Sequence, residues 1–169
     1  MNAHTPLTTL ALAGVQPQPN FAAIASGASV PYVEAGSGEP IVFVHGSLCD
    51  YRYWDPQLAA LSAHFHCFAP SLGHYWPETH AFGHGDFSWE AHVVEMAEFI
   101  EALGLGAVHL VGHSRGGCVA FHLARQYPHL VKTLTLADPG GPLQMTPNAE
   151  TGKLPPATQL LRATAAELI

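Results

Sequence analysis

Residues 107–117 read AVHLVGHSRGG, and this stretch decides the fold. An apolar run that predicts a strand leads into Gly112-His113-Ser114-Arg115-Gly116, and a helical pattern follows from Gly116 to Tyr127. A sharp strand-to-helix turn needs glycine two positions before and after the serine, because side chains at Gly112 and Gly116 would collide. The stretch therefore predicts a nucleophile elbow that exposes the Ser114 hydroxyl. A glycine-rich turn with an incidental serine is the alternative.

The expected turn also orients hydrogen-bond donors. The N–H of Arg115 and the positive end of the following helix point at the space above Ser114, where they can stabilise an oxyanion. A second donor is expected from a loop at the same edge of the sheet. Residues 45–47, His-Gly-Ser, follow an apolar strand, and the N–H of Ser47 is the candidate. We expect Ser47 and Arg115 to form an oxyanion hole.

Strand and helix patterns alternate along the rest of the chain. The run IVFV at 41–44 is continuously apolar, which is typical of a parallel strand buried on both faces. The alternation predicts an α/β fold with a mostly parallel sheet flanked by helices. In the helix that begins after Ser88, we expect the glutamates, Glu95 among them, to face mostly outward. Other strands are predicted at 30–34, 66–70, 107–111 and 130–137, and other helices at 55–63, 116–127 and from 157.

Composition excludes several classes of protein. The chain has 169 residues, the length of one domain. Thirteen acidic and six basic residues give a net charge of −7, which argues against nucleic acid as a partner. No apolar run reaches the roughly 20 residues that a membrane span needs. The three cysteines form neither a disulfide framework nor a CxxC pair, so we expect a reducing, cytoplasmic location.

Twelve histidines raise the question of a metal site. The sequence contains no HExxH pattern. Solvated loop histidines are the favoured interpretation, and neither a metal nor another cofactor is expected. The closest grouping lies in and after the loop at 71–87, and it comprises His74, His80, His84, Asp86 and His92.

The sequence resembles the α/β-hydrolase fold family. The resemblance rests on PIVFVHGS at 40–47, Trp54, GHSRGG at 112–117 and LTLADP at 134–139, and it covers about residues 28–142. It is similar to the esterase, haloperoxidase-like and carbon–carbon bond hydrolase members, which have a serine nucleophile. Epoxide hydrolases and haloalkane dehalogenases look similar, but they have aspartate where Ser114 stands. The resemblance therefore implies a fold, whereas it specifies the substrate only weakly.

The resemblance also implies what lies outside the matched part. The family order is serine, then acid, then histidine, and after Ser114 only His122 and His129 remain, both on or beyond the following helix. The family's histidine position has no counterpart here. Some members are similar in having their acid at the strand end occupied by Asp138, although an Asp-Pro turn is the favoured alternative for this residue. We expect a flexible tail at 1–20, a core at 21–142 and the start of a cap at 143–169.

Two functions follow from these observations. The first is a serine hydrolase that acts through Ser114 on a small ester or related acyl substrate, incomplete in this chain. The second is a non-catalytic, truncated hydrolase domain that acts in binding or assembly. A metal-binding module built on the histidine loop ranks last. Because the strand at 130–137 is expected to lack a neighbour, we also expect self-association or a complementing C-terminal chain.

Overall fold

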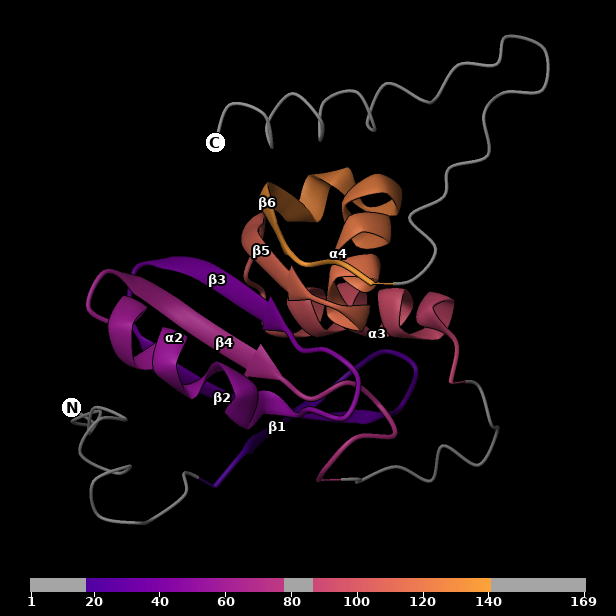
Figure 1. The fold of residues 1–169 in the computed structure, drawn as a ribbon, viewed down its shortest axis with the longest axis horizontal. Coiled ribbons are helices and arrows are strands. Elements are labelled where there is room, and N and C mark those ends of the chain that lie inside the picture. Colours follow the sequence, from indigo (N-terminus) through magenta and orange to yellow (C-terminus); the bar gives the residue numbers. More distant parts are fainter. Residues whose placement is uncertain (1–17, 78–86, 141–169) are drawn as a thin grey trace, which may run out of the picture.

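The computed structural model describes residues 18–77 and 87–140 (Figure 1). Six strands form one sheet in the order β1-β2-β4-β3-β5-β6. The strands are β1 (Asn20–Ala23), β2 (Ser29–Gly36), β3 (Glu39–Val44), β4 (Phe65–Pro70), β5 (Val108–His113) and β6 (Val131–Ala137). The helices are α2 (Asp55–Leu61), α3 (Trp89–Ala102) and α4 (Arg115–Gln126), with short 3₁₀ turns η1 (Tyr51–Trp54) and η2 (Pro128–Leu130).

The sheet is mixed and mostly parallel. β3 pairs in parallel with both β4 and β5, and β5 pairs in parallel with β6. β1 and β2 form an antiparallel hairpin, and β2 joins the sheet antiparallel to β4. The predicted α/β class with a mostly parallel sheet is therefore confirmed. Parallel neighbours bring the carboxyl ends of β3, β4 and β5 to one edge, where the loops after them meet.

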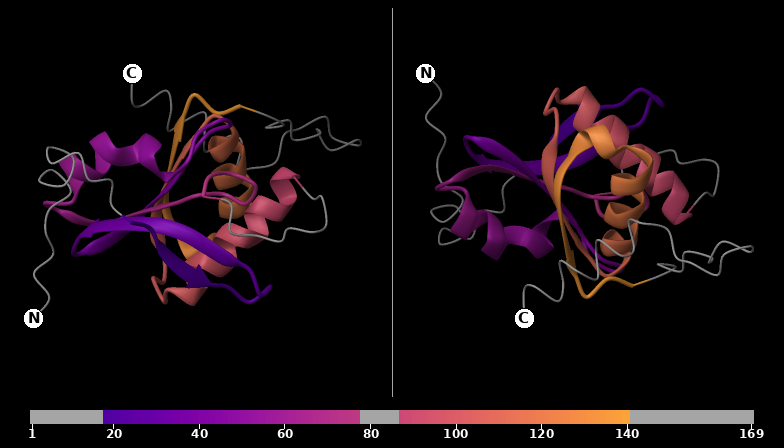
Figure 2. Two further views of the ribbon diagram at one scale, coloured as in Figure 1. Left: turned by 90° about the horizontal axis from the view of Figure 1, so that it is seen from below. Right: turned by 90° about the horizontal axis from the view of Figure 1, so that it is seen from above.

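Helices cover both faces of the sheet. In Figure 2, α2 lies on one face, and α3 and α4 lie on the other. Leu58 of α2 packs on one face with Val33, Phe43 and Trp54. A larger apolar cluster lies on the opposite face, where α3 and α4 supply Met96, Phe99, Ile100, Val119 and Leu123, among others. Val42 and Phe43 of β3 are both buried, so the strand is covered on its two faces, as its continuous apolar run predicts.

Local signals in the sequence account for the helix boundaries. Ser88 caps α3, and its hydroxyl accepts a hydrogen bond from the N–H of Ala91 at 3.1 Å. Pro56 lies in the first turn of α2, where a missing N–H has no cost. α4 ends at Gln126, before Pro128. None of the helices among the described residues is long and apolar enough to cross a membrane.

Two expectations need correction. β1 begins at Asn20, one residue inside the expected tail, because Asn20 pairs with Tyr32 and its amide donates to Glu34. Glu95 does not face outward: only 4% of its surface is exposed, because α3 lies against the loop after β4 on this side as well. The helix expected from 157, the cap expected at 143–169 and most of the 1–20 tail lie outside the described residues.

Candidate active site

Ser114 lies in the turn between β5 and α4, at the carboxyl edge of the sheet. Its backbone dihedrals are φ 51° and ψ −119°, a left-handed conformation that is strained for a residue with a side chain. Its N–H donates to the Ala137 carbonyl at 3.3 Å, which ties the turn to the end of β6. Its carbonyl accepts from Gly117 N–H at 2.9 Å and Cys118 N–H at 3.2 Å, and this starts the helix. The strained turn is therefore held from both sides.

The two outer glycines of the turn have no room for a side chain. A Cβ atom on Gly116 would overlap the carbonyl oxygens of Val44 and His45. A Cβ atom on Gly112 would overlap the carbonyl of Gly116 and lie 2.8 Å from Ala120 Cβ. Backbone of β3 and backbone of α4 therefore approach the turn directly. This close approach is the physical reason for glycine at both positions.

The loop after β3 packs against Ser114. A Cβ atom on Gly46 would lie 3.0 Å from Ser114 Cβ, so the two residues are in direct contact. Ser47 follows at once and is exposed, and Leu48 has a φ of 61°. Gly140 also reaches the turn, because its N–H donates to the Ser114 carbonyl at 2.9 Å. Segments after β3, β5 and β6 thus meet around one half-buried serine.

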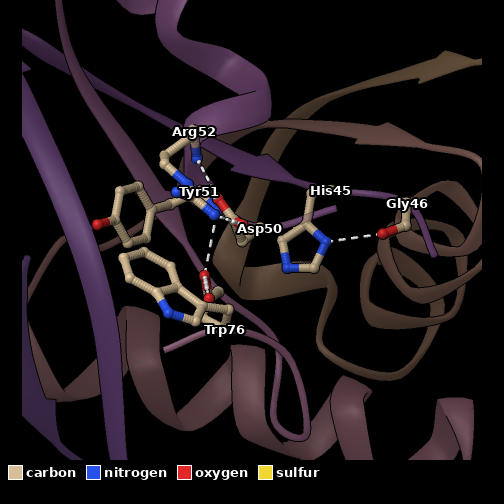
Figure 3. A network of polar contacts seen from close by, with 7 residues as sticks. His45, Gly46, Asp50, Tyr51, Arg52 and Trp76 are labelled. Carbon is tan, nitrogen blue, oxygen red and sulfur yellow. Dashed lines mark hydrogen bonds and ion pairs between the residues drawn. The ribbon is translucent and has the colours of Figure 1, made fainter. Parts of the chain in front are cut away.

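His45 holds the loop after β3 in place (Figure 3). The N–H of Leu72 donates to His45 Nε2 at 3.0 Å, so this nitrogen carries no proton. His45 Nδ1 therefore carries the proton and donates to the Gly46 carbonyl at 2.8 Å. Burial lowers the pKa of His45, which keeps the ring neutral. With both nitrogens engaged, His45 orders the loop and is not available as a base.

A second set of contacts fixes the loop after β4 (Figure 3). The hydroxyl of buried Ser71 accepts from the N–H of Tyr51 at 3.1 Å and donates to the carbonyl of Trp76 at 2.9 Å. The Arg52 guanidinium lies over the Trp76 ring, 4.0 Å from its centroid, and forms an ion pair with Asp50 at 2.6 Å. Sequence reasoning missed this anchor, because a lone serine at a strand end gives no signal.

The Arg115 side chain is held by Phe87 and His92. Its Nη2 donates to the Phe87 carbonyl at 2.5 Å, and its guanidinium lies 4.3 Å from the centre of the Phe87 ring. Its Nε donates to His92 Nδ1 at 3.4 Å. The roles of Ser47 and Arg115 as oxyanion donors stay predictions.

No histidine among residues 18–77 and 87–140 hydrogen-bonds to the Ser114 hydroxyl. His113 stacks on Tyr53, with ring centroids 4.9 Å apart, and His122 stacks on Trp89 at 3.9 Å. His129 contacts Tyr127. In the described part of the chain, the Ser114 hydroxyl therefore has no histidine base in contact with it.

Asp138 directly follows β6 and is exposed, with a φ of 48°. Aspartate is one of the few residues that tolerate a left-handed conformation, so Asp138 fits an Asp-Pro turn. Pro139 lies next to it against Gly117, since a Cβ atom on Gly117 would lie 2.8 Å from Pro139 Cβ. The role of Asp138 as an acid stays a prediction.

The described residues contain no group of three or more side chains able to hold a metal ion. Of the grouping named above, His74 and His92 are described, whereas His80, His84 and Asp86 lie outside the described residues. His92 is buried and hydrogen-bonded on both nitrogens to protein groups, so it is not a solvated loop histidine.

Glu95 should make stability depend on pH. Burial raises the pKa of Glu95 from 4.5 to about 7, because the carboxylate loses water that the N–H of Gly73 replaces only in part. The stabilisation of the protonated form is complete below pH 4.5 and is lost as pH rises through about 7. Glu95→Gln should therefore be more stable than the wild type at alkaline pH, by up to about 3 kcal/mol.

Urea unfolding of both proteins at acid and at alkaline pH measures this difference. The advantage of Glu95→Gln should vanish in acid, where the wild-type carboxyl is protonated. A difference between the two proteins that stays constant with pH would contradict the burial of an ionisable group at this position.

Comparison with known proteins places this chain in a family. A family model described as alpha/beta hydrolase fold matches residues 39–161. The 2-hydroxy-6-oxo-2,4-heptadienoate hydrolase of Pseudomonas putida is 33% identical over 118 residues, 67% of this chain and 42% of that protein. The (E)-2-((N-methylformamido)methylene)succinate hydrolase of Acinetobacter baylyi is 30% identical over 112 residues, 62% of this chain and 39% of that protein.

A mutant epoxide hydrolase from Bacillus megaterium is a similar solved structure. Its TM-score is 0.66 at 26% identity, and the match covers 71% of this chain and 42% of that chain. The chain thus spans about two fifths of the length of these three proteins. With the elbow, the strand order and a family match over more than half of its residues, the chain belongs to the alpha/beta hydrolase fold family.

Proposed function

We propose that Ser114 is the nucleophile of a hydrolase that acts on ester or related acyl bonds. The observation that carries the proposal is the strained elbow: Ser114 has a φ of 51° and lies in contact with Gly46 of the loop after β3. A serine held in this conformation presents its hydroxyl and the start of α4 to the same space. The relatives named as hydrolases support hydrolysis as the reaction class.

The chemistry follows from these groups. Ser114 Oγ attacks the acyl carbon, and the N–H groups of Ser47 and Arg115 stabilise the oxyanion that forms. The alcohol leaves with a proton, and water then releases the acid from the acyl-serine. A base must take the serine proton in the first step. Asp138 is the candidate acid to orient such a base, and none of the described histidines hydrogen-bonds to the Ser114 hydroxyl.

Serine at this position separates the proposal from epoxide hydrolysis. The match to an epoxide hydrolase concerns the fold, and the family resemblance implies aspartate in those enzymes at the position where this chain has Ser114. A carboxylate opens an epoxide without losing a proton, whereas a serine hydroxyl must lose one. A carbonyl substrate gains most from backbone donors beside the nucleophile, because its oxygen becomes charged in the transition state.

We expect the isolated chain to turn over p-nitrophenyl acetate far more slowly than ordinary enzymes, whose kcat values are roughly 1–10³ s⁻¹. Without a base the hydroxyl stays protonated, while backbone donors alone still give some catalysis over water. Stopped assays followed by peptide mass spectrometry measure the turnover and locate the acetyl group. The acetyl group should appear on Ser114, and Ser114→Ala should remove it.

An acetyl group found elsewhere, or an equal amount in Ser114→Ala, would contradict the proposal. Turnover at ordinary enzyme rates that Ser114→Ala abolishes would support the nucleophile and would overturn the expectation that the chain has no base. Buffer alone and the Ser88→Ala protein serve as controls, because Ser88 is a serine at the start of a different helix, α3.

A second candidate function, binding or assembly without catalysis, is favoured by the edge of the sheet at β6. No strand among the described residues pairs with the outer side of β6. Thr133, Thr135 and Ala137 are exposed along it, and the charge of Lys132 is engaged by Glu39 at 2.6 Å. Unpaired backbone N–H and C=O groups on a long edge strand favour pairing with another chain.

We therefore expect the purified chain to dimerise, aggregate or require a complementing chain. Size-exclusion chromatography with light scattering measures its mass. A stable monomer of 18.0 kDa with a sharp thermal transition would contradict this expectation. It would imply that another segment of the chain covers β6.

A further inference from the structure

We propose that His92 of α3 is a positioning residue for the oxyanion donors, because it ties the Arg115 side chain to the loop after β4. The proposal rests on the proposed function and deepens it. It concerns the groups that hold the Arg115 backbone N–H beside Ser114, and it assigns this task to a residue on a different element. The assignment follows from a chain of hydrogen bonds that connects three loops at the carboxyl edge of the sheet.

The first link is the Arg115 side chain. Arg115 is the first residue of α4, so the orientation of its N–H depends on how that first turn is held. Its guanidinium is fixed at three points: Nη2 on the Phe87 carbonyl, the guanidinium face on the Phe87 ring, and Nε on His92 Nδ1. A side chain with several rotatable bonds is thereby confined to one arrangement.

The second link is the His92 ring, which is 2% exposed. An arginine can only donate, so His92 Nδ1 must accept, and the ring proton is on Nε2. His92 Nε2 then donates to the Gly73 carbonyl at 3.2 Å. The N–H of the same Gly73 donates to Glu95 Oε2 at 3.0 Å, one turn further along α3. His92 and Glu95 of α3 therefore hydrogen-bond to the carbonyl and the N–H of Gly73 in the loop after β4.

The third link leads to the other donor. Leu72, next to Gly73, donates its N–H to His45 Nε2, and His45 Nδ1 donates to the Gly46 carbonyl. Gly46 contacts Ser114 and precedes Ser47. The loop at 72–73 is thus bonded to both sides of the site, through His45 on one side and through His92 on the other. The two rings carry their protons on opposite nitrogens, Nδ1 in His45 and Nε2 in His92.

The two hydrogen bonds give His92 a role beyond filling space in the core. A phenylalanine would fill the same space, but it would leave the Arg115 Nε and the Gly73 carbonyl without this partner. Burial, and next the charge of Arg115, lower the pKa of His92 to about 4, so the ring stays neutral and can accept at neutral pH. The charged and titratable groups around it are Arg115, His74 and His45.

Three variants separate the two bonds of the ring. His92→Asn places an amide oxygen near the Nδ1 position and keeps an acceptor for Arg115. His92→Gln reaches the Nε2 position and keeps a donor for Gly73. His92→Phe keeps the shape and removes both bonds. The first readout is nuclear magnetic resonance of the full chain, which reports the ring tautomers and the chemical shift and exchange rate of the Arg115 amide without any ester present.

We expect the wild-type spectra to show the proton on Nδ1 in His45 and on Nε2 in His92. The Arg115 amide should exchange at least about tenfold faster in His92→Phe and return towards the wild-type rate in His92→Asn. In a Ser114→Cys background, acetylation of the introduced thiol should fall about tenfold with His92→Phe and recover with His92→Asn. Failure of acetylation alone, with the amide pattern as expected, would count against the proposed function and leave the positioning role standing.

Opposite tautomers in the wild-type spectra would overturn the proposal, even if a variant fails to fold. Rescue of the Arg115 amide by His92→Gln and not by His92→Asn would also overturn it, since His92 would then act only by fastening α3 to Gly73. An unchanged Arg115 amide in a folded His92→Phe would show that Phe87 alone holds the arginine.

Discussion

Gly116→Ala should lower the free energy of unfolding by at least about 3 kcal/mol. The added methyl group would overlap the carbonyl oxygens of Val44 and His45, which are backbone atoms of β3 and of the loop after it. A side chain can move aside, but β3 is hydrogen-bonded to β4 and β5 and cannot. The change therefore forces α4 away from the sheet, and the turn that holds Ser114 is lost with it.

Gly104→Ala is the matched control for this change. Gly104 lies two residues beyond α3 with a φ of +62°, and a Cβ atom there would meet nothing within 4 Å. Its cost is only the left-handed conformation, about 1 kcal/mol. Denaturant unfolding monitored by circular dichroism compares the two variants. Equal denaturation midpoints for Gly104→Ala and Gly116→Ala would show that the backbone of β3 does not exclude a side chain at position 116.

The sheet and the turn could be predicted because their signals are local. The apolar run at 41–44 and the run before Gly112 each predict a buried strand. Glycine at 112 and 116 is required by the sterics of the turn itself. Ser88 was recognisable as a helix cap for the same reason. Such features depend on neighbours in the sequence, so they can be read without the fold.

The parts that could not be predicted depend on distant contacts. Glu95 lies on the expected solvent face of its helix, but it is buried and accepts a hydrogen bond from Gly73 in the loop after β4. Arg115 reaches Phe87, which is 28 residues away in the sequence. β1 has four residues without a strong strand pattern, and its pairing with β2 makes it a strand. Tertiary contacts of this kind override local preference.

Ser114→Cys should be acetylated by p-nitrophenyl acetate at least about tenfold faster than a thiol at a plain helix start. Sulfur ionises far more readily than a hydroxyl, so the reaction needs no histidine base. The start of α4 should lower the pKa of the introduced thiol, and the donors beside it should stabilise the oxyanion. The thiolate attacks the acyl carbon, a thioester forms, and p-nitrophenolate leaves.

The background reaction must be removed first. Cys49 lies in the loop after β3 and is partly exposed, so the measurement uses a Cys49→Ser background. Cys67 and Cys118 are buried, and burial raises the pKa of both thiols, that of Cys67 to about 11. They will not compete at neutral pH.

The most direct test of Ser114 as the reactive centre is the rate of thioester formation in Ser114→Cys against Ser88→Cys, followed by intact-protein mass spectrometry. Both variants place a thiol at the start of a helix of at least twelve residues, α4 or α3, so the helix dipole acts on both. Of the two serines, Ser114 has Gly46 packed against it, and it is the one for which we propose a loop donor, the N–H of Ser47. A rate at least about tenfold higher for Ser114→Cys is predicted. Equal rates, or a slower reaction at position 114, would contradict the assignment of this elbow as an acyl-transfer site.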